Sequence, residues 1–349
     1  MGVQATGFDL PGDGEGVRAM KSGILRAPFP AFGGKSRAAH LVWQRFGDVR
    51  NYVEPFCNSC AVLLGRPQPF DGCETVNDMD GFIANFWRAL HADPDAVAHH
   101  CDWPVNELDL HARHQWLVNV GVEHVARLRS EPDYFDAKIA GWWCWGCCQW
   151  IGSGWCHHPE WEQLPHLGTA GMGVHRPSQQ LPHLGNAGMG DSSPEPETPE
   201  LYQYMTALAE RFRRVRVCCG DWSRVCGPTP TVKQGLTAVF LDPPYADTAE
   251  RDSDLYAVDS LTVAHDVREW ALANGDDPRL RICLAGYEGE HQMPQSWEVV
   301  EWKAKGGYGS QRLSGDNENA KKERLWFSPH CLKPNANRLR QRELLEACV

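Results

Sequence analysis

The residues best suited to chemistry are Asp242, Pro243, Pro244 and Tyr245, which directly follow a short apolar run. That run, residues 237–241, reads as a parallel strand buried on both faces. In an open α/β sheet, ligands bind beyond the carboxyl ends of the strands, so these four residues are expected where chemistry takes place. The two prolines stiffen the backbone and remove amide donors. The pattern therefore predicts a rigid cluster of hydrogen-bond acceptors.

Such a cluster suits an aromatic exocyclic amine, whose lone pair is delocalised into the ring. The Asp242 carboxylate and the Pro243 carbonyl can each accept one amine hydrogen, which localises the lone pair toward a sulfonium methyl group. Tyr245 is expected to stack on the base, which must leave the duplex because its amine is otherwise paired. The chemistry requires neither a metal nor a covalent intermediate. For the tetrapeptide alone, an ordinary turn after a strand is the alternative reading.

Two more carboxylates are expected close to this site. Residues 51–56 read as a strand that ends in a turn, and residues 74–78 read as the next strand. Glu54 and Asp78 therefore lie near adjacent strand ends. A Gly-rich loop precedes both strands and consists of Phe32, Gly33, Gly34 and Lys35.

In their order along the chain, these motifs resemble the DNA adenine-specific (N6) methyltransferase family with an Asp-Pro-Pro-Tyr motif, of the phage or restriction-modification type. The Phe32 to Lys35 loop is similar to that family's Gly-Gly-Lys cofactor loop. Glu54, Pro55 and Phe56, followed by Ser59, are similar to its Glu-Pro-Phe-x-Gly-Ser-Gly turn, which approaches the methionine part of the cofactor. Asn77 and Asp78 correspond to the acidic strand end that holds the cofactor ribose. The resemblance covers residues 28–93 and 201–330.

The resemblance implies a Rossmann-like α/β sheet of the S-adenosylmethionine-dependent methyltransferase type, with a helical, loop-rich insert. It implies a site-specific enzyme that methylates the N6 amine of a flipped adenine. Lys35 would lie near the cofactor or the catalytic loop; without the resemblance it reads as a surface lysine. The implied catalytic residues are Asp242, Pro243, Pro244 and Tyr245, and the implied S-adenosylmethionine-binding residues are Phe32, Gly33, Gly34, Lys35, Glu54, Pro55, Phe56, Asp78 and Asp242.

The chain departs from the family pattern at Asn58 and Cys60, where the family has two glycines. Asn tolerates a positive φ, whereas Cys does so poorly. We expect the turn to form, with a cofactor that sits differently or binds more weakly. Two alternative functions stay open. One is methylation of the N4 amine of cytosine, which uses the same chemistry; the other is a DNA-binding relative that has lost catalysis, which the replacements at Asn58 and Cys60 support.

The elements that must position these residues divide the chain into four expected parts. They are a flexible leader (1–25), a catalytic domain (26–95 and 201–330), an insert with a possible role in target recognition (96–200) and a basic C-terminal tail (331–349). One expected helix buries Phe82, Ile83, Phe86, Trp87 and Leu90, and another buries Leu201, Tyr204, Met205, Leu208 and Phe212. Residues 104–151 are predicted to be helical, with Pro104 in a first turn. Further strands are expected at 215–218, 237–241 and 281–285, and 297–302 with 324–327 are expected to form an antiparallel edge pair.

The insert contains an unusual segment, residues 141–158, with five tryptophans, four cysteines and two histidines. A tetrahedral zinc site could be formed here by the side chains of Cys144, Cys147, Cys156 and His157. If the segment is helical, buried packing is the alternative. A repeat follows at 163–173 and 180–190, which suggests either an exposed insertion or loops that reach DNA.

Composition limits the possible partners and the location. A net charge of −11 over 349 residues argues against non-specific coating of nucleic acid, although an enzyme needs only a local basic face. The first 25 residues contain no apolar run, so neither a signal peptide nor a membrane anchor is expected. Fourteen cysteines in such a chain read as reduced thiols. The expected partner is double-stranded DNA, without a membrane or an obligate protein partner, in the cytoplasm of a bacterial or phage-infected cell. The candidate basic groups are Arg211, Arg213, Arg214 and Arg216; Lys321, Lys322 and Arg324; and Lys333, Arg338, Arg340 and Arg342.

Overall fold

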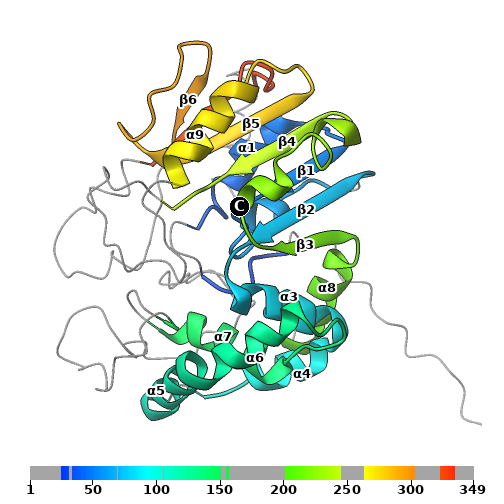
Figure 1. Cartoon of the computed structure of the whole chain (residues 1–349), viewed down its shortest axis with the longest axis vertical. Coiled ribbons are helices and arrows are strands. Elements are labelled where there is room, and N and C mark those ends of the chain that lie inside the picture. The colour runs from blue at the N-terminus through cyan, green and yellow to red at the C-terminus, as the bar shows by residue number, and fades with distance from the viewer. Residues whose placement is uncertain are drawn as a thin grey trace, which may run out of the picture.

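The computed structural model describes residues 25–30, 34–68, 70–104, 106–150, 155–156, 201–244, 263–302 and 323–334. Its strands are β1 (Asn51–Glu54), β2 (Cys73–Asp78), β3 (Val215–Cys219), β4 (Thr237–Leu241), β5 (Leu280–Tyr287), β6 (Glu298–Glu301) and β7 (Glu323–Phe327). They form one seven-stranded sheet in the order β3-β2-β1-β4-β5-β7-β6 (Figure 1). The expected α/β class is therefore confirmed, and each expected strand is present.

The direction of the strands determines which residues share an edge of the sheet. Strands β1 to β5 are parallel to one another, whereas β7 is antiparallel to both β5 and β6. The late edge pair is therefore antiparallel, as expected. Chain order reverses between the neighbours β1 and β4, which makes their carboxyl ends a topological switch point. Because β7 is reversed, its first residue lies at the same edge as the ends of β4 and β5.

Helices cover both faces of the sheet because successive strand residues point to opposite sides. On one face, residues such as Tyr52 and Phe240 share a hydrophobic cluster with α1 (Ala39–Phe46), α2 (Ala61–Leu64) and α8 (Leu201–Phe212). On the other, alternate residues such as Val239 and Ile282 pack with α9 (Val263–Asn274). This alternation is why the strands read as continuous apolar runs.

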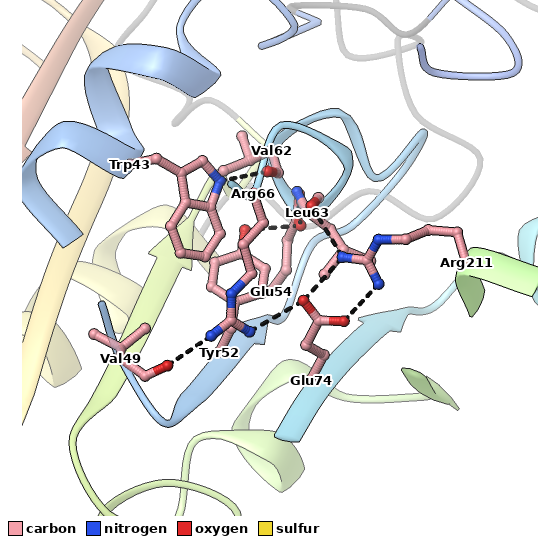
Figure 2. A network of polar contacts seen from close by, with 9 residues as sticks. All are labelled: Trp43, Val49, Tyr52, Glu54, Val62, Leu63, Arg66, Glu74 and Arg211. Carbon is pink, nitrogen blue, oxygen red and sulfur yellow. Dashed lines mark hydrogen bonds and ion pairs between the residues drawn. The ribbon is translucent and has the colours of Figure 1, made fainter. Parts of the chain in front are cut away.

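A buried ion-pair network on the first face of the sheet connects β2 to the helices that pack there (Figure 2). The Glu74 carboxylate, with 1% of its side chain exposed, lies 3.1 Å from Arg66 Nη1 and 2.7 Å from Arg211 Nη1. Arg66 also donates to the Val49 carbonyl at 2.6 Å. The network connects the loop after α2, the strand β2 and the end of α8.

The remaining helices form a group beyond the β3 edge of the sheet (Figure 1). They are α3 (Gly81–Ala92), α4 (Pro94–Cys101), α5 (Glu107–Trp116), α6 (Val122–Ala126) and α7 (Ala137–Gln149). Helix α3 packs against α4, α7 and α8, and α4 packs against α7 and α8. One hydrophobic cluster runs from the sheet into this group. The predicted division into a catalytic domain and an insert stays a prediction, but the described part of the insert shares its core with the sheet.

Most apolar faces expected from the sequence are buried, including all five positions named for α3 and all five for α8. The structure corrects the predicted helical range 104–151 in two places. Residues 130–136 form a loop between the 3-10 turn Arg127–Arg129 and α7. The second correction is the position of Pro104. It lies before α5, which begins at Glu107, because the Asn106 side chain caps the helix by accepting from the Asp109 amide at 3.1 Å. Helix α4, with Pro94 in its first turn, was not expected. A π-helical turn at Leu117–Gly121 continues the path of α5, and its Val120 side chain is 38% exposed.

Several predictions lie outside the described residues. They concern Phe32, Gly33, Tyr245 and His157, both copies of the repeat, the leader up to residue 24 and the tail from residue 335. Within the ranges that the structure does describe, no helix has the length and apolar character needed to cross a bilayer.

Candidate active site

A buried lysine lies at the centre of the candidate site. Lys35 is 4% exposed, and its Nζ lies 3.0 Å from Asp242 Oδ1 and 3.7 Å from Glu323 Oε2. Its carbonyl accepts from the Ala38 and Ala39 amides at 2.9 Å, which fixes the residue at the start of α1. Lys35 is therefore not a surface lysine. It lies beside Asp242, the residue that directly follows β4.

The sheet topology brings these groups together from distant parts of the chain. Asp242 directly follows β4, Glu323 is the first residue of the reversed strand β7, and Trp302 follows the end of β6. The Lys35 ammonium lies 5.8 Å from the centroid of the Trp302 ring, within cation–π range. All four residues thus meet at the carboxyl edge of the sheet, next to the switch point.

Sequence reasoning missed Glu323 because its place depends on strand order. Its signal in the sequence is a carboxylate directly before Arg324, at the start of a strand whose last three residues are apolar. Only the antiparallel placement of β7 turns that residue toward the ends of β4 and β5.

The charged groups of this cluster shift one another's pKa values. Burial lowers the pKa of Lys35, but the adjacent Asp242 and Glu323 carboxylates outweigh burial and hold it above its ordinary value. Burial raises the pKa of Asp242, Lys35 opposes that effect, and the net shift is upward. Asp242, 21% exposed at its side chain, is therefore a better proton acceptor than an ordinary surface carboxylate.

The turn between β1 and α2 contains two non-glycine residues with left-handed backbone. Asn58 has a φ of 41° and Cys60 a φ of 56°, so both adopt the left-handed conformation at the positions where the family has glycine. Cys60 is fully buried, so its side chain points into the core. The expectation that the turn forms despite both substitutions is confirmed.

Glu54 ends β1 inside the protein. It is 2% exposed, and its Oε2 accepts from the Tyr52 hydroxyl at 2.8 Å and from the Leu63 amide at 3.2 Å. Burial raises the pKa of Glu54 to about 8. The side chain holds the turn and α2 in place. Its neighbour Phe56 is half-buried, with its ring centroid 6.1 Å from that of Trp222.

Asp78 and Asn77 connect the ends of neighbouring strands. The Asp78 carboxylate accepts from the Asn58 and Asp80 amides, each at 3.0 Å, while burial raises its pKa. The Asn77 side chain donates to the Pro55 and Gly220 carbonyls at 2.9 Å. The ends of β1, β2 and β3 therefore form one framework.

The predicted site residues that are described thus share one edge of the sheet. Lys35 and Asp242 are in direct contact, and Pro243 and Pro244 continue from β4, the first buried and the second half-buried. Gly34 precedes Lys35 and is exposed. Glu54, Pro55, Phe56 and Asp78 belong to the neighbouring strand ends.

The described part of the Cys- and Trp-rich segment is mostly a packed helix, α7, which ends at Gln149. Cys144 and Cys148 in α7 donate to the Pro28 carbonyl at 3.8 Å and 3.7 Å, and Cys156 is buried against His114, whose Nδ1 accepts from its amide. Among the described residues, no group of three or more His, Cys, Asp or Glu side chains could hold a metal ion. His157 lies outside them, so a zinc site with Cys144, Cys147 and Cys156 stays a prediction.

No protein-family model matches the chain, and no curated protein matches it at a significant level.

Proposed function

We propose that the chain is an S-adenosylmethionine-dependent DNA methyltransferase that methylates the N6 amine of adenine. The observation that carries the proposal is the buried contact between Lys35 and Asp242, 3.0 Å apart at the carboxyl edge beside the β1–β4 switch point. It joins the two motifs whose resemblance to this family is most specific. The seven-stranded mixed sheet is compatible with a methyltransferase-type fold.

In this proposal, Asp242 and Pro243 bind the target amine. The carboxylate and the carbonyl each accept one amine hydrogen, so the nitrogen lone pair is aimed at the methyl group. The raised pKa of Asp242 makes it a stronger acceptor for the proton that leaves as the new N–C bond forms. The buried Pro243 adds a carbonyl on stiff backbone.

The residues around the β1–α2 turn fit the proposed cofactor, which supplies an electrophilic methyl group when bound. Left-handed backbone at Asn58 and Cys60 lets the chain turn as the glycines of the family pattern do. Asp78 accepts two backbone amides, and a carboxylate has further acceptor sites for ribose hydroxyls. Lys35 and Phe56 complete the described part of the proposed pocket, and Glu54 supports it from inside.

The DNA partner, the recognition role of residues 96–200 and the cytoplasmic location belong to the same proposal. The residues of the site do not distinguish between target bases, because the Asp242 carboxylate and the Pro243 carbonyl can bind the N4 amine of cytosine equally well. The motif order favours adenine through the family resemblance.

The proposal is tested by incubating purified protein with unmethylated plasmid DNA and S-adenosylmethionine carrying a labelled methyl group. The DNA is then digested and the modified nucleoside identified. We expect N6-methyladenine. N4-methylcytosine would keep the mechanism and change the base, and DNA without label under conditions of demonstrated cofactor binding would contradict the proposal.

The catalytically inactive relative makes a different prediction. Its main support was the replacement of two glycines by Asn58 and Cys60, and both residues adopt the conformation that glycine would take. Titration calorimetry with S-adenosylmethionine separates the two readings: an active pocket releases or absorbs heat on binding, whereas a lost pocket gives none.

A further inference from the structure

Glu323 is a buried charged residue of the site that the proposed chemistry does not use. It is 3% exposed, and its Oε2 lies 3.7 Å from Lys35 Nζ. Removing a carboxylate from water is unfavourable unless a nearby opposite charge compensates it. Lys35 compensates Glu323 and Asp242 together, so the three side chains form one electrostatic unit.

The Lys35 ammonium faces two carboxylates, so its attraction is divided between Asp242 and Glu323. Lys35 Nζ is nearer to Asp242, at 3.0 Å, and the Trp302 ring lies 5.8 Å away. Three other ionisable groups among the described residues act on the unit. Tyr287 at the end of β5 interacts with Lys35, Glu54 at the end of β1 interacts with Asp242, and the buried Cys283 of β5 interacts with both. Because Glu323 takes part of the interaction with Lys35, Asp242 is bound less tightly than it would be in a simple pair.

Building on the proposed function, we propose that Glu323 is a positioning residue for methyl transfer. By sharing Lys35, it keeps the Asp242 carboxylate available to the substrate amine. In the reaction, the amine nitrogen forms a bond to the methyl carbon, the electrons of the breaking C–S bond remain on sulfur, and one amine proton passes to Asp242 and then to water. A carboxylate locked to Lys35 accepts that proton poorly.

The electrostatics agree with this role. Burial raises the pKa of Asp242, Lys35 lowers it and Glu323 raises it. Removing the charge of Glu323 leaves the full effect of Lys35 on Asp242. The Asp242 pKa then falls, which makes the carboxylate a weaker base.

The test is Glu323→Gln, which keeps the shape of the side chain and removes its charge. We expect kcat to fall roughly tenfold or more, with KM for S-adenosylmethionine within about twofold of wild type. The acid limb of the kcat–pH profile should move to lower pH, a shift that loss of packing alone does not produce. Glu323→Asp retains the charge and should restore part of both effects.

Glu298→Gln is the matched control. It removes a carboxylate on the neighbouring strand β6, 2.7 Å from Arg45, without touching the Lys35 unit, so the pH profile should not change. Unchanged kcat and pH profile in Glu323→Gln, with active wild type, would overturn the inference.

A second readout needs no substrate. The Asp242 carboxyl can be titrated by NMR with carbon-13-labelled aspartate, assigned through Asp242→Asn. The inference predicts a lower Asp242 pKa in Glu323→Gln than in wild type. If the Asp242 pKa is lower in Glu323→Gln but the wild-type protein has no transferase activity, the proposed function is contradicted and the electrostatic role of Glu323 is supported. If the Asp242 pKa is the same in both proteins, the inference itself is contradicted.

Discussion

At the scale of single residues, burial makes the carboxyl group of Glu54 sensitive to pH. Its pKa lies at about 8 instead of 4.5 because the side chain is buried beneath the β1–α2 turn. The folded protein then keeps a proton that the unfolded chain has already released. Between these two values, the free energy of unfolding therefore decreases as pH rises, and above about pH 8 the loss is complete.

Glu54→Gln removes this titration but keeps an oxygen to accept from Tyr52 and Leu63. We expect the stability of wild type relative to the variant to decrease from about pH 5 to about pH 8. Urea unfolding of both proteins across that range measures the difference. Parallel stability curves would show that Glu54 does not titrate in this window.

At the scale of elements, the β1–α2 turn depends on left-handed backbone. Asn58 adopts a φ of 41°, which a β-branched side chain tolerates poorly. Asn58→Val should lower the free energy of unfolding by about 1–2 kcal/mol, whereas Asn58→Gly should cause no loss. Chemical denaturation of the pair tests this, and equal stability of the two variants would contradict the assigned turn.

The packing of α8 on β2 depends on the Glu74 network. Arg211→Met leaves Glu74 with Arg66 alone, and we expect a loss of up to about 3–5 kcal/mol, as for a broken buried ion pair. Arg213→Met is the control, because Arg213 has 69% of its side chain exposed and pairs only at the surface with Glu210. Its effect should stay within about 1 kcal/mol. Comparable losses in both variants, measured by urea unfolding, would refute a special role for the network.

Helices and strands could be predicted from the sequence where the spacing of apolar residues determines them. The positions of site residues relative to one another could not, because they depend on the order of the strands in the sheet. The apolar run at Thr237–Leu241 defines β4 without tertiary information because both faces of the strand are buried. Lys35 and Asp242 were selected by residue type and motif order, yet only the fold brings them within 3.0 Å. The prediction of a helix start at Pro104 was wrong because the Asn106 cap, two residues later, determines where α5 begins.

At the scale of the whole molecule, the helical group and the sheet should unfold together. Trp87 of α3 stacks on Phe212 of α8, with ring centroids 3.9 Å apart and planes 9° apart, inside the cluster that also covers the sheet. Trp87→Ala should lower the free energy of unfolding by about 3–5 kcal/mol while keeping one transition. Far-ultraviolet circular dichroism and tryptophan fluorescence should give coincident curves. Separate transitions for the two probes would mean that the helical group is an independent unit.

The central claim, transfer of a methyl group to a base amine at Asp242, is tested most directly by single-turnover methylation of unmethylated DNA by wild type and Asp242→Asn. Asparagine keeps the shape of the side chain but cannot accept the amine proton as a carboxylate does. We predict labelled base in wild type and a rate at least about a hundredfold lower in the variant, both measured at saturating S-adenosylmethionine. Equal rates in the two proteins would contradict the claim.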